Sequence, residues 1–102
     1  MLLKIDTEAE GSTLNVTLSG EFDMGGVAAF RAAVEDPPEP WKRVAIAMHD
    51  VVFMDSSGLQ ELLRLHNRAR VRDLEVVLVR PSVPVMTLLE LTGLESHFSI
   101  RE

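Results

Sequence analysis

The spacing of apolar residues changes repeatedly along the chain, and this change constrains the fold more than any other feature. Leu14, Val16 and Leu18 alternate with polar residues, as in a strand with one buried face. In residues 25–34 and 57–69 the apolar positions instead recur every three or four residues, as on one face of a helix. Because the two kinds of segment alternate, we expect an α/β fold in which helices connect the strands of one sheet.

These patterns predict the element order ββαβαβα(β). The expected strands cover residues 2–8, 12–20, 43–48 and 75–79, with a short edge strand at residues 97–100. The expected helices cover residues 25–34, a segment that begins near Ser57, and residues 83–92. The continuous apolar runs at residues 43–48 and 75–79 are typical of strands that are covered on both faces.

Proline and glycine indicate where two of the helices end. The first helix cannot continue past Asp36, because prolines follow at positions 37, 38 and 40, and we expect a loop there. The third helix is expected to have Ser82 as its N-cap and Gly93 in a left-handed conformation after its last turn, with Leu94 folding back onto it.

Size and composition limit the classes of protein that fit. A chain of 102 residues can enclose one hydrophobic core, so residues 1–102 are expected to form a single domain. A net charge of −6 repels a phosphate backbone, which disfavours direct nucleic-acid binding. The absence of cysteine, of a leader segment and of any long apolar run favours a cytoplasmic protein that does not enter a membrane.

The junction between the strand at residues 43–48 and the following helix carries the most chemical information. Asp55, Ser56, Ser57 and Gly58 place a carboxylate and two hydroxyls at the start of that helix. Free N–H groups and the positive end of the helix dipole accommodate oxygen-rich or phosphorylated side chains there. Gly58 would leave room for the backbone of another molecule. The alternative is that these residues only cap the helix, and four residues alone do not distinguish the two interpretations.

Three segments in a fixed order extend this observation over the whole chain. They are Gly20-Glu21-Phe22-Asp23, the segment from Val51 to Leu59, and Leu89-Glu90-Leu91-Thr92-Gly93-Leu94. Together they resemble the bacterial anti-sigma factor antagonists, small single-domain members of the STAS family. The resemblance implies a central mixed sheet of four to five strands, with three to four helices packed on it, and a protein that is not an enzyme.

The resemblance also implies a partner switch. In this family the unphosphorylated antagonist binds an anti-sigma factor, usually itself a serine kinase, and thereby frees a sigma factor. Phosphorylation of the first serine after the aspartate, here Ser56, ends the binding, and a serine phosphatase resets the cycle. The partner-binding residues implied are Glu21, Asp23, Met24, Gly25, Asp55, Ser56, Ser57, Gly58 and Leu59. Asp55 would cap the helix or orient the acceptor hydroxyl, whereas Ser57 is expected to be the better cap.

Two positions depart from the family pattern. Ala47 stands where many relatives have an Asp, and Asp73-Leu74 replaces a Gly-Gly pair before the next strand. Both departures leave the segment around Ser56 intact.

Other sites receive little support from the sequence. The three histidines lack the spacing of metal ligands, and no cofactor motif is present. A Ser-His-Asp hydrolase is disfavoured because Asp55 and Ser56 are adjacent in the chain. Arginines at positions 64, 68, 70 and 72 are expected to complement the helix dipole, with Glu61 pairing with Arg64. The main rival to an antagonist is a STAS adaptor that is not phosphorylated and serves a transporter or a stress-sensing complex.

Overall fold

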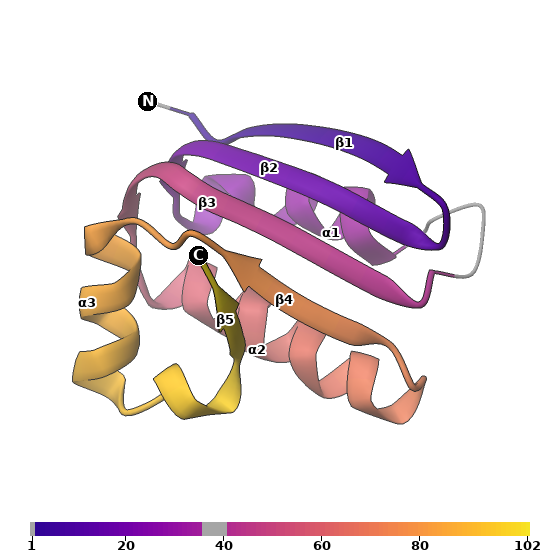
Figure 1. The fold of residues 1–102 in the computed structure, drawn as a ribbon. Coiled ribbons are helices and arrows are strands. Elements are labelled where there is room, and N and C mark those ends of the chain that lie inside the picture. The colour runs from indigo at the N-terminus through magenta and orange to yellow at the C-terminus, as the bar shows by residue number, and fades with distance from the viewer. Residues whose placement is uncertain (1, 36–40) are drawn as a thin grey trace.

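The computed structural model describes residues 2–35 and 41–102, which build one five-stranded sheet (Figure 1). Its strands lie in chain order and are β1 (Lys4–Glu10), β2 (Thr13–Phe22), β3 (Arg43–Met54), β4 (Glu75–Val79) and β5 (Ser99–Arg101). β1 is antiparallel to β2, and the remaining neighbours are parallel. The mixed sheet and the order ββαβαβαβ confirm the predicted fold class.

Three α-helices connect the parallel strands in the described part of the chain. They are α1 (Val27–Glu35), α2 (Ser56–Val71) and α3 (Val83–Thr92), supplemented by the 3₁₀ turns η1 (Met24–Gly26) and η2 (Glu95–His97). The expected helix at residues 25–34 is therefore η1 followed by α1. The end of α1 at Glu35 agrees with the limit expected from the prolines, while the expected loop at residues 37–40 lies outside the described residues.

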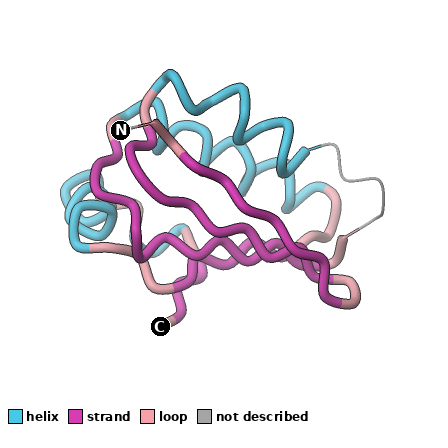
Figure 2. The backbone as a smooth tube through the Cα atoms, turned by 90° about the horizontal axis from the view of Figure 1, so that it is seen from above, coloured by secondary structure: helices cyan, strands magenta, loops and turns pink. Residues whose placement is uncertain are grey.

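Seen from above, the sheet has α1 and α2 on one side and an open face on the other (Figure 2). Along β3, Val44, Ile46 and Met48 are fully buried, whereas Ala45 and Ala47 are only half-buried. The expectation that the strand at residues 43–48 is covered on both faces is therefore wrong. Small side chains on the open face expose little apolar area, so no second layer is needed there. For β4 the expectation is confirmed, because Val76, Val77 and Leu78 are all buried.

Several strand bounds differ from the predicted ones, most of all in β3. The edge strand expected at residues 97–100 is β5 at Ser99–Arg101, because His97 belongs to η2. β1 and β2 occupy residues 4–10 and 13–22 instead of 2–8 and 12–20, and β3 continues to Met54 instead of ending at residue 48. Its pairing with β2 shifts register twice, so that β3 contains extra residues near His49 and at Val52. Such bulges interrupt the alternation of apolar and polar residues. The continuation of β3 was therefore not visible as a strand pattern.

Side chains from the helices and from the last segment complete the core. The rings of Phe22 and Phe30 lie 4.9 Å apart and join β2 to α1. His66 of α2 packs against Phe98, with ring centroids 5.4 Å apart, at the boundary of the core. Burial first, and then the charges of Arg70 and His97, lower the pKa of His66 below its usual value.

The ends of α3 follow the sequence signals in part. Gly93 has a φ of 70° and Leu94 N–H donates to the Leu89 carbonyl over 2.9 Å, which confirms the predicted helix end. Ser82 occupies the N-cap position, but its side chain does not cap α3. Its hydroxyl instead donates to the Val51 carbonyl over 2.6 Å and holds α3 against the extension of β3.

An ion pair between a half-exposed arginine and a buried glutamate joins α1 to α2. Both carboxylate oxygens of Glu61, which is 4% exposed, accept from Nε of Arg31 over 2.5 and 3.0 Å. The structure thus gives Glu61 a partner on another helix, and its expected pairing with Arg64 stays a prediction. Arg31 can bring its guanidinium over the edge of α1 to a carboxylate that faces inward, and a charge-assisted bond of this kind offsets the cost of burying Glu61.

Gly58 in the first turn of α2 lets the helix approach the end of β2. A Cβ atom at this position would lie 2.5 Å from the Phe22 carbonyl oxygen and 2.8 Å from Cγ of Met54. Neither distance is compatible with van der Waals contact, so only glycine fits without a shift of the backbone. The close packing of α2 on β2 thus depends on a residue that carries no side chain.

We expect Gly58→Ala to lower the free energy of unfolding by about 2 kcal/mol, because the new methyl group displaces a backbone carbonyl. Urea denaturation of the two proteins measures this difference. Gly25→Ala is the matched control, since Gly25 is exposed and its nearest neighbour would be Asp23 Oδ1 at 3.2 Å. Equal stabilities of all three proteins would contradict the close packing at Gly58.

Candidate functional site

The start of α2 and the turn after β2 meet at the ends of two parallel strands. Phe22 and Met54, the last residues of β2 and β3, are paired in the sheet. The backbone N–H of Asp55 then donates to the Phe22 carbonyl over 3.4 Å. The turn that contains Asp23 and the segment that contains Ser56 are therefore held side by side, as the family resemblance implied.

Asp55 is the cap of α2. Its Oδ1 accepts from the backbone N–H groups of Ser57 over 2.9 Å and of Gly58 over 3.3 Å. One carboxylate thereby satisfies two of the free N–H groups of the first turn and places negative charge at the positive end of the helix. This confirms the capping role expected for Asp55 and corrects the expectation that Ser57 is the better cap, because Ser57 is already inside the helix.

The two serines differ in accessibility. Ser56, the first residue of α2, is exposed, whereas Ser57 is half-buried. Ser57 faces a groove of about 280 Å³ between η1, α1 and α2, whose lining includes Met24, Val27 and Gln60. A kinase that must bring a hydroxyl into its own active site therefore has easier access to Ser56.

The turn after β2 presents an acidic and an apolar side chain next to the serines. Asp23 caps η1, because its Oδ1 accepts from Gly25 N–H over 3.0 Å. Met24 follows with 75% of its surface exposed, and Gly25 is also exposed. Glu21 is half-buried and pairs with Phe53 in the sheet. These residues are placed where a protein docking on Ser56 would meet them.

Two residues expected at the partner surface are buried instead. Leu59 is 6% exposed and belongs to the hydrophobic core. Gly58 is buried against the carbonyl of Phe22, so the space beside it is filled by the chain itself and not left for another molecule. Their part of the motif positions α2 in the fold.

Sequence reasoning missed two apolar residues on the rim of this site. Val52 and Phe53, near the end of β3, are 53% and 47% exposed. The bulge at Val52 changes which side chains face outward, and the apolar spacing does not show it. An exposed valine and phenylalanine next to each other are the kind of apolar contact that protein interfaces use.

The two departures from the family pattern lie away from this junction. Ala47 is half-buried in the middle of β3, where it pairs with Thr17 and Val79. Asp73 adopts a φ of 59° in the turn after α2, a left-handed conformation that aspartate tolerates better than most residues. It thus occupies a backbone conformation that is suited to glycine.

Among the described residues, no group of three or more histidine, cysteine or acidic side chains is arranged to hold a metal ion. None of the helices described for residues 2–35 and 41–102 combines the length and hydropathy needed to span a membrane.

Comparison with known proteins agrees with the geometry. The model of the STAS domain family matches residues 4–102. A STAS-domain containing protein of Pseudomonas aeruginosa is 29% identical over 92 residues, which cover 90% of this chain and 91% of the relative.

Solved structures with the same fold include SpoIIAA in its unphosphorylated form, with a TM-score of 0.79 and 22% identity over 95% of this chain and 87% of SpoIIAA. The phosphorylated form of the Bacillus protein has a TM-score of 0.74 and 20% identity, covering 97% of this chain and 90% of its own. The STAS domain of a SulP transporter from Vibrio cholerae has a TM-score of 0.72 and 17% identity. The match covers 93% of this chain and 77% of the transporter domain's chain. Since the family model covers nearly the whole sequence and the fold agrees, the chain belongs to the STAS domain family.

Proposed function

We propose that this protein is an anti-sigma factor antagonist whose partner binding is ended by phosphorylation of Ser56. The unphosphorylated chain binds an anti-sigma factor that is also a serine kinase, and this frees a sigma factor for transcription. A serine phosphatase restores the unphosphorylated form. The cycle takes place in the cytoplasm, and the chain itself contacts neither nucleic acid nor membrane.

The observation that carries this proposal is the position of Ser56. Its side chain is exposed in the first turn of α2, next to the capping Asp55 and beside the turn that holds Asp23 and Met24. Proteins of the STAS domain family are not enzymes, so an exposed hydroxyl in such surroundings is better explained as a substrate for modification than as a nucleophile. SpoIIAA, which shares this fold, has been solved in a phosphorylated form.

The charge of a phosphate explains how binding would end. A phosphoserine adds roughly −1.5 to −2 charges and three strong acceptor oxygens. A partner that fits closely around an uncharged hydroxyl would have to accommodate a dianion in the same place. A loss of about 2.7 kcal/mol is sufficient to weaken the affinity a hundredfold.

A second function is favoured by the likeness to the STAS domain of the Vibrio cholerae SulP transporter. In that case the chain would be an adaptor that binds a transporter or a stress-sensing complex permanently and is not phosphorylated. The two functions differ in whether Ser56 ever carries a phosphate.

We expect the cognate kinase to label the wild-type chain and Ser57→Ala, but not Ser56→Ala, because Ser56 is the more accessible hydroxyl. Phosphopeptide mass spectrometry identifies the modified residue. Ser56→Ala should also retain the anti-sigma factor in the presence of ATP, as pull-down experiments can show. Normal labelling of Ser56→Ala together with loss of labelling in Ser57→Ala would assign the site to Ser57. A chain that no kinase labels, yet forms a stable complex, would support the adaptor.

We expect Asp23→Lys to weaken binding of the anti-sigma factor about tenfold, because it places a positive charge in an acidic turn at the interface. Calorimetry measures the affinity, and circular dichroism measures the stability of the same preparation. The substitution also removes the cap of η1, at a cost of about 1 kcal/mol. Asp23→Asn separates the two effects, since it keeps the acceptor oxygen and removes the charge. Unchanged affinity of Asp23→Lys would place Asp23 outside the interface.

We expect phosphorylation of Ser56 to change the structure only locally. Rearranging α2 would expose Leu59 and Leu62, and burial of each contributes roughly 1.5–3 kcal/mol. A phosphate at the positive end of the helix contributes no comparable free energy that would favour unfolding. Melting temperatures should therefore be similar, and amide spectra should differ only near residues 21–26 and 54–62. Widespread shifts through β4 and α3 would show that the change is global.

A further inference from the structure

β1 is a long and regular edge strand (Figure 1). It covers seven residues, Lys4–Glu10, and pairs with β2 in one continuous register. In the part of the chain that the structure describes, no strand pairs with its other side, so half of its backbone N–H and C=O groups point outward. The opposite edge strand, β5, has only three residues. Of the two edges, β1 therefore offers much the longer template for a further strand.

A groove lies between β1 and α1 at this edge of the sheet. It has a volume of about 500 Å³, and its lining consists of Leu3, Ile5, Thr7, Ala29, Ala32 and Ala33. Leu3 and Ile5 are only half-buried, and Ala29 and Ala32 are exposed. Because α1 does not cover this side of β1 fully, a strand added about 5 Å beyond β1 would place alternate side chains over the exposed alanines.

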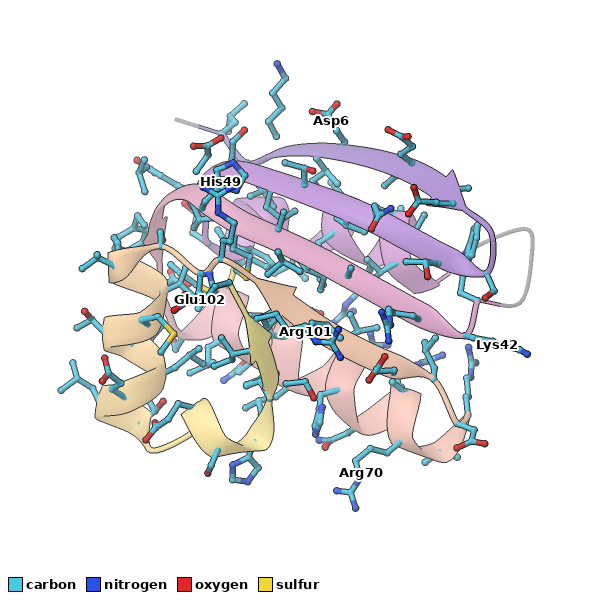
Figure 3. All side chains as sticks on the ribbon, viewed as in Figure 1. Asp6, Lys42, His49, Arg70, Arg101 and Glu102 are labelled. Carbon is cyan, nitrogen blue, oxygen red and sulfur yellow. The ribbon has the colours of Figure 1, made fainter. Side chains whose placement is uncertain are left out.

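The opposite face of β1 is acidic. Side chains alternate along a strand, so Asp6, Glu8 and Glu10 point away from the groove that Ile5 and Thr7 line. All three acidic residues are exposed, and Figure 3 shows Asp6 projecting from β1 into the solvent. A second copy of the chain that paired through β1 would bring carboxylates opposite carboxylates, which is destabilising. The acidic face thus opposes self-association, but it does not oppose a strand of the opposite charge.

We propose that β1 binds an extended segment of another protein in which apolar and basic side chains alternate. Main-chain hydrogen bonds to the outer edge of β1 hold the segment as a sixth strand. Its apolar side chains lie in the groove over Ala29 and Ala32, and its basic side chains face Asp6 and Glu8. Charge complementarity and the alternation of the two faces of β1 thereby define the sequence pattern of the partner.

An extended segment fits this edge better than a helix or a nucleic acid does. A helix satisfies its own backbone groups, so it could fill the groove but would leave the edge of β1 unpaired. The carboxylates of β1 repel a phosphate backbone. The inference goes beyond the proposed function, because none of the residues that line the groove belongs to the junction around Ser56. It applies equally to an antagonist and to an adaptor.

The test measures binding of a fluorescent peptide, Lys-Val-Lys-Val-Lys-Val-Lys, to the full-length chain by fluorescence anisotropy at physiological salt. A second peptide has the same composition, but its lysines and valines form two separate blocks. It controls for the general attraction of cations to a chain with a net charge of −6. We expect the alternating peptide to bind about tenfold more tightly than the block peptide. Equal affinities of the two peptides would overturn the proposal.

Reversal of the charge on β1 tests the acidic face. We expect Asp6→Lys/Glu8→Lys to bind the alternating Lys-Val peptide about tenfold more weakly, and to bind an alternating Glu-Val peptide more tightly than the wild type does. A misfolded variant could not produce this gain. The matched control is Glu90→Lys/Glu95→Lys, which makes the same change in net charge on two exposed residues outside β1. Equal effects of the two double variants contradict binding at β1.

A substitution on α1 tests the groove. Ala32→Lys places a long charged side chain where the apolar side chains of the peptide are expected, so it should weaken binding about tenfold. Ala28→Lys is the matched control, because Ala28 is also exposed on α1 but does not line the groove. This control should bind within about twofold of the wild type. If Ala32→Lys binds as tightly as the control does, the groove is not used and the proposal fails.

Amide hydrogen exchange of the wild-type chain shows whether the peptide is added as a strand. Backbone N–H groups of residues 4–10 that point outward should exchange more slowly when the peptide is bound, because they then donate to it. The exchange of α3 should not change. Binding without protection of β1 would overturn strand addition. A wild-type chain that sediments as a dimer, and that the peptide converts to monomers, would show that a second copy occupies the edge and would overturn the proposed partner.

Discussion

The close approach of α2 to the end of β2 is the constraint on which the rest of the site depends. Gly58 leaves no side chain between the helix and the Phe22 carbonyl, and Asp55 N–H bonds to that same carbonyl. These two contacts bring the turn after β2 against the first turn of α2. Together with the pairing of Phe22 and Met54 in the sheet, they place Asp23 and Ser56, which are 33 positions apart in the chain, on one surface.

That constraint also separates the residues that hold the site from those that a partner can reach. Asp55, Gly58 and Leu59 cap the helix, allow its close approach and anchor it in the core. Ser56 lies between Asp55 and Gly58 in the chain, and Met24 lies in the neighbouring turn after β2. Both residues face solvent. Under the proposed function, a phosphate on Ser56 would therefore lie on the outside of this junction. Its effect falls on whatever binds there, because the interior contacts of α2 are already complete.

A feature of the fold or of the site could be predicted from the sequence only where the local spacing of residues determines it. The alternation of apolar residues in β2 was visible because one face of that strand is buried and the other is not. The extension of β3 was not visible, because its bulges break the period, so Phe53 was missed as an exposed residue. Similarly, the sequence Asp55-Ser56-Ser57 does not show which of these three polar residues caps α2. The cap is Asp55 and not Ser57, because β3 ends directly before Asp55. The partner of Glu61 comes from α1, and no spacing within α2 could have indicated Arg31.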